Sequence, residues 1–167
     1  GSALLSTLSL GITVVDAWCW ETNEECSELV ETHFPVKRMG DFRSTPPETV
    51  ADLIKKQPAD VQILLTAAPP CPSYSRILSA TAKGRQDPEG HKFQEFVDWW
   101  IQIEKITGRQ RTLLENVVPN NTGDKVHFMQ QHQCSATVVD AADYRTISRP
   151  RIWYHRFEWP KKVSIDN

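Results

Sequence analysis

The sequence contains a cysteine and three carboxylates whose positions suit covalent and acid–base chemistry. Cys71 lies in the proline-rich segment APPCPSYS, and a cysteine thiolate is a nucleophile toward electrophilic carbon. Glu115 directly follows two leucines in RTLLEN, so we expect its carboxyl group to be buried, and burial raises the pKa of a carboxyl group. A carboxyl group with a raised pKa can protonate a substrate near neutral pH. Glu21 and Asp41 follow two further β-rich runs.

Six β-rich runs alternate with amphipathic helical patterns along the chain, as is typical of a parallel sheet covered by helices. The predicted strands are residues 13–20, 36–39, 61–67, 111–116, 135–141 and 151–156. The predicted helices are residues 3–10, a helix that Thr22 opens with Glu25 completing a capping box, a helix starting at residues 45–48, and residues 91–106 and 124–133. The apolar stripe of residues 91–106 is expected to pack in the core. The sequence therefore predicts an α/β protein with a doubly wound, mostly parallel sheet.

Glu21, Asp41 and Cys71 each follow a predicted strand, and Glu115 closes the predicted strand RTLLEN. In a doubly wound sheet, ligands bind outside the carboxyl ends of the strands, so we expect these groups to converge on one edge. Ordinary structural roles stay open for three of them. Cys71 could be an inert loop cysteine, Glu21 could cap the following helix, and Asp41 could form a turn with Gly40.

Length and composition restrict the class of protein. At about 150 residues per domain, 167 residues predict a single domain spanning 1–167. The 19 basic against 21 acidic residues leave a net charge of −2, which argues against a module dedicated to tracking phosphates. No apolar run approaches the ~20 residues that cross a bilayer and no secretory signal is present, so we expect an intracellular protein without a membrane partner. The four cysteines form no C-x-x-C pair and no metal-ligand spacing, so neither disulfides nor a metal is predicted.

Several short motifs, in their order along the chain, resemble those of the cytosine-5 DNA methyltransferases. The segment PPCPSYS at 69–75 is similar to the P-C-x-x-x-S nucleophile loop of that family, and LENV at 114–117 matches its E-N-V motif. The segment RPR at 149–151 is similar to its R-x-R motif. Glu21 and the GDF at 40–42 have the order of its cofactor-binding acids. The resemblance covers essentially the whole chain and is closest to the eukaryotic de novo branch.

The resemblance implies a reaction and the residues that would carry it. Carried over to this sequence, Cys71 would add to C6 of a cytosine, and Glu115 would contact N3 and the exocyclic amine. Asn116 would position the loop around Cys71, while Arg149 and Arg151 would hold the base or its phosphate. The target would be a cytosine flipped out of DNA and methylated at C5, without a metal. The implied fold is the Rossmann-like fold of S-adenosylmethionine-dependent methyltransferases, and the implied location is the nucleus for a eukaryotic protein.

The resemblance also implies which residues would bind S-adenosylmethionine. Glu21, with Thr22 beside it, would accept hydrogen bonds from the ribose hydroxyls. Asp41 would bind the adenine amino group, and Phe42 would lie against the adenine face. Pro70 would line the pocket beside the methyl donor.

The sequence departs from the family pattern in three places. It begins after the strand and F-x-G loop that open the family's domain, so we expect the neighbouring sheet edges to be exposed. Ile147 stands where the family has a glutamine before R-x-R, and we expect the target-recognition domain to be missing. These departures predict a partial catalytic core that a further segment or a second subunit completes. Two alternatives stay open: a catalytically silent methyltransferase-like module that binds or regulates an active partner, and an RNA cytosine-5 methyltransferase of the same lineage.

Overall fold

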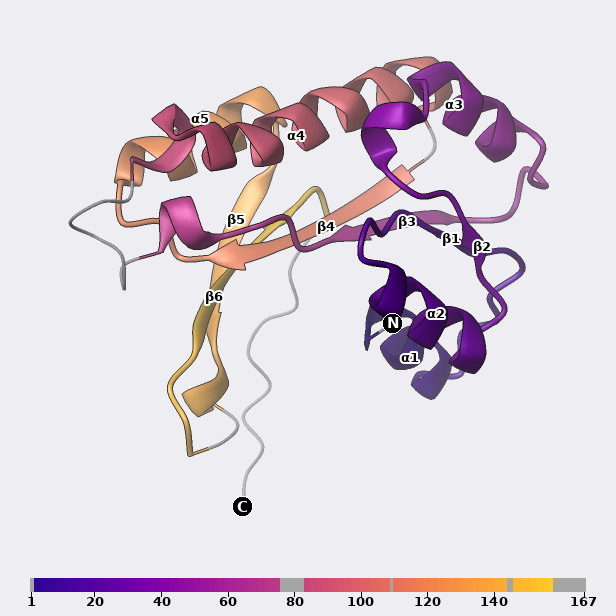
Figure 1. The fold of residues 1–167 in the computed structure, drawn as a ribbon, viewed down its shortest axis with the longest axis horizontal. Helices are drawn as coiled ribbons and strands as arrows, with labels where there is room; N and C mark the ends of the chain where they lie inside the picture. Colours follow the sequence, from indigo (N-terminus) through magenta and orange to yellow (C-terminus); the bar gives the residue numbers. More distant parts are fainter. Residues whose placement is uncertain (1, 76–82, 109, 144–145, 158–167) are drawn as a thin grey trace. The chain divides into compact units, whose positions relative to one another are not determined.

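The computed structural model describes residues 2–75, 83–108, 110–143 and 146–157. The chain is a mixed α/β protein that divides into two compact units, Gly1–Leu53 and Ile54–Asn167 (Figure 1). The first unit contains a two-stranded sheet and the second a four-stranded sheet. Within the described residues, no helix is both long enough and apolar enough to span a bilayer.

The first unit is built on a short parallel sheet. Helix α1 (Ser2–Ser9) precedes strand β1 (Trp18–Cys19), and helix α2 (Glu24–His33) connects β1 to its parallel partner β2 (Lys37–Arg38). Gly11 has a φ of 73°, the left-handed conformation that suits a glycine after a helix. Both strands are shorter than the predicted runs, because each pairs with the other over only two residues.

The start of α2 corrects the predicted capping box. Asn23, not Thr22, is the N-cap residue, and its side chain accepts a hydrogen bond from the Cys26 N–H at 2.9 Å. Glu21 Oε1 accepts the Asn23 N–H at 2.8 Å. Asparagine is as good an N-cap as threonine, so a cap one residue later costs nothing in capping strength.

Helix α3 (Pro47–Lys55) begins at Pro47 with Glu48 beside it, as predicted. The preceding Thr45 is buried, and its hydroxyl accepts a hydrogen bond from Trp20 Nε1 at 3.2 Å. This bond holds the segment before α3 against Trp20, the residue that follows β1.

The second unit contains a mixed sheet with the strand order β3-β4-β6-β5. Its strands are β3 (Ile63–Ala67), β4 (Gln110–Val117), β5 (Ser135–Asp140) and β6 (Pro150–His155). Only the β3–β4 contact is parallel, because β6 lies between β4 and β5 and is antiparallel to both. The connection between β5 and β6 is too short for a parallel crossover, so β6 pairs antiparallel to β5. The predicted parallel pairing therefore does not extend beyond β4 in this sheet. Since β6 alone is reversed, β3, β4 and β5 point in the same direction.

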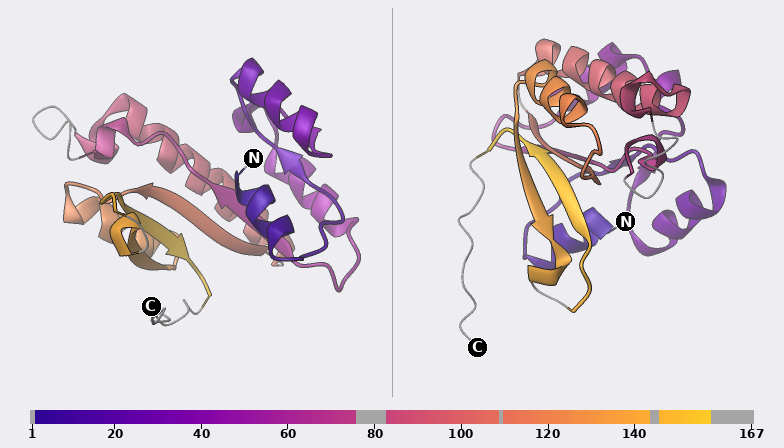
Figure 2. Two further views of the ribbon diagram at one scale, coloured as in Figure 1. Left: turned by 90° about the horizontal axis from the view of Figure 1, so that it is seen from below. Right: turned by 90° about the vertical axis from the view of Figure 1, so that its left-hand side faces the viewer.

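Two helices cover one face of this sheet. Helices α4 (Pro88–Thr107) and α5 (Thr122–Gln131) lie on the same side of the strands, as both views in Figure 2 show. The predicted apolar stripe of α4 is confirmed as core, with Ile101 alone only partly buried. The buried members are Phe93, Phe96, Val97, Trp100 and Ile103. A hydrogen bond of 2.6 Å from Gln94 Nε2 to Gln131 Oε1 joins the two helices.

Strand β3 lies at one edge of the four-stranded sheet. Its residues alternate between buried and exposed, so Ile63 and Leu65 are in the core while Leu64 is 52% exposed. This alternation differs from the expectation that both faces are covered, because α4 and α5 lie on the same face.

Candidate active site

The nucleophile candidate Cys71 lies four residues after the end of β3. It directly precedes a single 3-10 turn, η2 (Pro72–Tyr74), and its carbonyl oxygen accepts the Tyr74 N–H at 3.0 Å. Its side chain is half-buried, whereas the neighbouring Ser73 is buried. The thiol is therefore carried by a turn whose following residues are anchored in the core.

Glu115 and Arg151 form an ion pair across two neighbouring strands. Glu115 on β4 is paired in register with Trp153 on β6, and Glu115 Oε1 lies 2.8 Å from Arg151 Nε. The Glu115 side chain is 24% exposed, so it is not buried in the way that its position after two leucines predicted. The alternation of β4 explains this difference: Leu114 faces the core, and Glu115 therefore faces the opposite side of the sheet.

Asn116 links β4 to the segment that carries Cys71. Its side chain is 2% exposed, and its Nδ2 donates a hydrogen bond to the Pro69 carbonyl at 3.5 Å. Its Oδ1 accepts the Val117 N–H at 2.8 Å, which fixes the orientation of the amide. Asn116, which the family resemblance predicts to position this loop, thus contacts the backbone two residues before Cys71.

The parallel register of β3 and β4 decides where the Cys71 segment leaves the sheet. Ala67 pairs with Leu114, so the segment that follows Ala67 leaves β3 at the level where β4 continues through Glu115 and Asn116 to Val117. The structure therefore links the segment before Cys71 to Asn116, and it pairs Glu115 with Arg151 on the face of the sheet opposite Leu114. Arg149 is exposed one residue before β6, and within the described part of the chain no ion pair joins it to this group.

The two acidic cofactor candidates lie in the first unit, after its two parallel strands. Trp18 pairs with Lys37, so Glu21 and Asp41 both follow the carboxyl-terminal ends of β1 and β2. Asp41 caps the 3-10 turn η1 (Phe42–Ser44) by accepting the Arg43 N–H at 2.9 Å. Glu21 accepts the N–H of Asn23, which is itself the N-cap of α2, so Glu21 supports the cap residue and does not cap the helix. A carboxylate accepts up to about four hydrogen bonds, so this role is compatible with a ligand.

The other cofactor candidates differ in their surroundings. Phe42 is half-buried, with the Arg43 guanidinium carbon 5.3 Å from its ring centre. Thr22 is exposed, directly before the N-cap Asn23 of α2. Pro70 is exposed beside Cys71 in the second unit.

The sequence did not lead us to predict two contacts of the second unit, those of Tyr74 and Arg156. Tyr74 is 2% exposed and anchors the turn that carries Cys71 in the core. An aromatic residue three positions after the cysteine was the feature of the sequence that could have indicated this anchor. Arg156 donates to Glu104 on α4 and to the carbonyl of His132 after α5. No local pattern predicts contacts of Arg156 with residues that lie this far away in the sequence.

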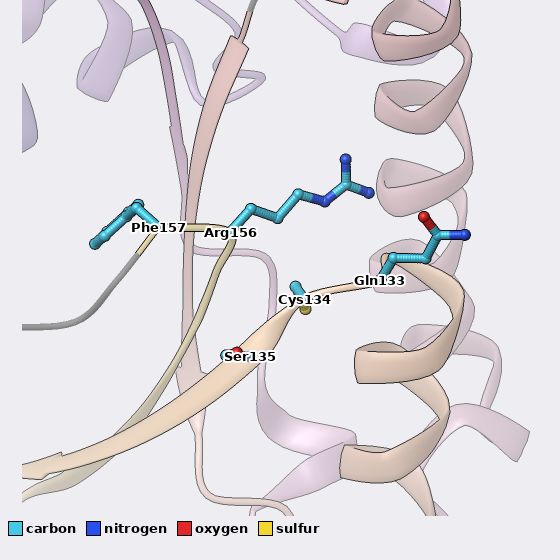
Figure 3. Close-up of a pocket in the computed structure, with 5 residues that line it drawn as sticks. All are labelled: Gln133, Cys134, Ser135, Arg156 and Phe157. Atoms are coloured by element: carbon cyan, nitrogen blue, oxygen red, sulfur yellow. The ribbon is translucent and has the colours of Figure 1, made fainter.

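A shallow depression lies at the other end of β6 from Arg151 (Figure 3). It is lined by Gln133, Cys134, Ser135, Arg156 and Phe157 and has a volume of about 620 Å³. Burial raises the pKa of the Cys134 thiol to about 11, so this cysteine is protonated at neutral pH. Cys134 therefore does not supply an ionised nucleophile to this depression.

A comparison of the sequence with protein-family models and with curated proteins finds no match. Among the described residues, no three histidine, cysteine or acidic side chains are grouped so that they could hold a metal ion.

Proposed function

We propose that this chain is part of the catalytic core of a DNA cytosine-5 methyltransferase. The observation that carries the proposal is the junction of the Cys71 loop with β4, where Asn116 Nδ2 donates to the Pro69 carbonyl beside the Glu115–Arg151 pair. A nucleophile and a carboxylate at one edge of a parallel strand pair are the two groups that activation of a pyrimidine ring needs.

Cys71 acts as the nucleophile in this proposal. Its thiolate forms a bond to C6 of cytosine, which places the electron pair of the C5–C6 double bond on C5. After C5 has gained a methyl group, the C5 proton leaves, the electron pair re-forms the double bond, and the bond from Cys71 to C6 breaks. The thiolate is thereby regenerated.

Glu115 stabilises the ring while Cys71 is bonded to it. Its carboxyl group contacts N3 and the exocyclic amine, where the negative charge of the addition step develops. Arg151 holds one oxygen of this carboxyl group at 2.8 Å, which fixes the direction of the other. Asn116 keeps the nucleophile loop beside Glu115 through its bond to Pro69.

The residues of the first unit fit an adenosine cofactor chemically. Glu21 and Asp41 follow two parallel strands, and each keeps acceptor capacity beyond the backbone N–H that it accepts. Glu21, with Thr22 beside it, would hold the ribose hydroxyls, while Asp41 and Phe42 would bind the adenine; Pro70 belongs to the second unit. S-adenosylmethionine supplies an electrophilic methyl group when it is bound.

The sheet of the second unit supports a Rossmann-like reading of the α/β fold, because three of its four strands point in one direction. The near-neutral charge of the chain agrees with the proposal that a further segment or a second subunit supplies most phosphate contacts. The target base must leave the duplex to reach Cys71, so single-stranded DNA removes the need for that step.

The test uses single-stranded and duplex DNA containing 5-fluorocytosine, together with S-adenosylmethionine. Fluorine at C5 cannot leave as a proton, so the bond from Cys71 to C6 persists and yields an adduct that survives denaturation. We expect the adduct with the native chain and with Cys26→Ser, which removes an exposed thiol, but not with Cys71→Ser. Cofactor binding without an adduct on any substrate would indicate the silent module, and an adduct only with 5-fluorocytosine RNA would indicate the RNA enzyme.

A further inference from the structure

Tyr74 connects the Cys71 turn to two other segments of the second unit. Its N–H donates to the Cys71 carbonyl at 3.0 Å, and its own carbonyl accepts the Asn120 N–H at 3.2 Å in the segment after β4. Its hydroxyl donates to the Gly90 carbonyl at 2.8 Å, in the first turn of α4. One residue therefore joins the nucleophile loop to the helical layer and to the segment that follows Glu115.

The ring of Tyr74 is held by edge-to-face contacts. Its centre lies 5.9 Å from that of Phe93 and 5.7 Å from that of Phe128, with interplanar angles of 81° and 70°. Such contacts restrict the orientation of the ring and therefore the position of its hydroxyl. Burial and the nearby Asp124 raise the pKa of Tyr74, so the hydroxyl remains a donor throughout the physiological range.

The acceptor of this hydrogen bond is itself fixed by close backbone packing. A Cβ atom on Gly90 would lie 2.0 Å from the Gly84 carbonyl oxygen, so η4 (Gly84–Gln86) packs directly on the first turn of α4. Only a glycine permits this approach. The Gly90 carbonyl is therefore a fixed point to which the Tyr74 hydroxyl is attached.

The turn η2 has little support of its own. It is three residues long, and Cys71 at its start makes no side-chain capping bond. An isolated 3-10 turn of this length depends on tertiary contacts for its conformation. The bond from Tyr74 to Gly90 is such a contact.

We propose that Tyr74 is a positioning residue for the Cys71 thiol, acting through the hydrogen bond from its hydroxyl to the Gly90 carbonyl. The catalytic consequence rests on the function proposed above, whereas the effect on the thiol does not. When the bond is absent, η2 moves more freely and the Cys71 thiol samples a wider range of positions.

Tyr154 offers a matched control in the same aromatic cluster. Its ring centre lies 6.0 Å from that of Phe93 and 6.1 Å from that of Phe128, and it is 1% exposed. In the described part of the structure its hydroxyl has no hydrogen-bond partner. Tyr154→Phe thus removes a hydroxyl from this cluster without removing a hydrogen bond.

The experiment compares Tyr74→Phe with Tyr154→Phe by two measurements. The first is the rate at which iodoacetamide alkylates Cys71 in the chain without DNA, followed by mass spectrometry of the Cys71 peptide. We expect Tyr74→Phe to raise this rate about fivefold, the factor that one typical hydrogen bond contributes to a local equilibrium, and Tyr154→Phe to leave it unchanged. Equal alkylation rates in the two variants would overturn the proposal.

The second measurement is the formation of the 5-fluorocytosine adduct. Tyr74→Phe should slow adduct formation at saturating S-adenosylmethionine about tenfold or more, with an unchanged KM for the cofactor, because misplacement of a reacting group slows the chemical step. Loss of cofactor affinity at an unchanged maximal rate would contradict positioning. If the native chain forms no adduct, the proposed function fails, while the alkylation rates still decide the role of Tyr74.

Discussion

Glu115 and Arg151 face each other across β4 and β6, with Glu115 Oε1 2.8 Å from Arg151 Nε. Their side chains are 24% and 25% exposed, so water screens the attraction between them. Ion pairs with access to solvent typically contribute less than about 1 kcal/mol to folding. The pair therefore matters more for the direction of the Glu115 carboxylate than for the stability of the sheet.

Replacing Glu115 by glutamine separates the contribution of this residue to catalysis from its contribution to folding stability. We expect Glu115→Gln to slow adduct formation on 5-fluorocytosine DNA about 100-fold, because a group that stabilises developing charge is lost. The free energy of unfolding in urea should change by less than about 1 kcal/mol. Glu89→Gln, which alters an exposed pair with Lys92 on α4, is the control and should change neither quantity. An unchanged rate in Glu115→Gln would remove this residue from the proposed mechanism.

Asn116→Asp tests the donor that holds the nucleophile loop. The substitution keeps the size of the side chain but replaces the Nδ2 that donates to the Pro69 carbonyl by an oxygen. At pH 7 we expect a loss of about 1–3 kcal/mol in the free energy of unfolding, because a buried oxygen then faces a carbonyl oxygen. The loss should shrink near pH 4, where a protonated carboxyl group can donate again.

Asn120→Asp is the matched control for this experiment. Its side chain is exposed, and its backbone N–H donates to the Tyr74 carbonyl. Equal effects of the two substitutions at pH 7 would show that added charge, and not the lost donor, destabilises Asn116→Asp.

The long elements were predicted from the sequence because one periodicity dominates each of them. The stripe that contains Phe93 and Trp100 recurs at helical spacing, and the structure extends the predicted helix by only a few residues to Pro88–Thr107. The antiparallel direction of β6 was not predictable, because an apolar run does not reveal whether its strand will pair parallel or antiparallel. The division of contacts into two compact units is likewise a property of long-range packing.

The candidate site was predictable where residue order and strand ends decide it. The course of the Cys71 segment beyond the carboxyl end of β3 follows from the parallel β3–β4 pair, which two apolar strands joined by a helix already indicate. The burial of Glu115 was overestimated, because two preceding leucines do not reveal which face of β4 the helices cover. The bond from Tyr74 to Gly90 depends on α4 returning over the loop, which no local signal encodes.

Arg156 joins three elements of the second unit, and its removal should weaken their packing. It forms an ion pair with Glu104 on α4, and its Nε donates to the His132 carbonyl at 2.7 Å. Burial raises the pKa of Glu104, and the guanidinium offsets part of this effect. We expect Arg156→Ala to lower the free energy of unfolding at pH 7 by about 2 kcal/mol, because Glu104 is then charged without its partner.

The pH dependence of this loss distinguishes charge from packing. Without Arg156 the pKa of Glu104 is raised further, so the cost of ionising Glu104 in the folded state applies at neutral pH and disappears below its usual value near 4.5. Urea unfolding at pH 7 and pH 4 should therefore show a smaller difference between native and variant at pH 4. A difference that is the same at both pH values would assign the effect to packing alone. Lys105→Ala, which removes an exposed positive charge from the same helix, should leave the free energy of unfolding unchanged at both pH values.

His132 should make the second unit sensitive to acid. Its ring is 1% exposed, and within the described residues neither ring nitrogen has a hydrogen-bond partner. Burial, with a smaller contribution from Arg156, lowers the pKa of His132 to about 4 from its usual value of 6.5. Between these two values the unfolded chain binds a proton that the folded chain does not, so stability is complete above pH 6.5 and falls as the pH drops toward 4.

The measurement is the free energy of unfolding between pH 7 and pH 4 for the native chain, His132→Leu and His91→Gln. The native chain should lose about 2–3 kcal/mol through this group over that range. His132→Leu should show a flatter pH dependence, since leucine has no proton to bind, whereas His91→Gln, at an exposed position, should follow the native curve. A native and a His132→Leu curve that remain parallel would show that His132 is protonated equally in the folded and unfolded states, contrary to the burial found here.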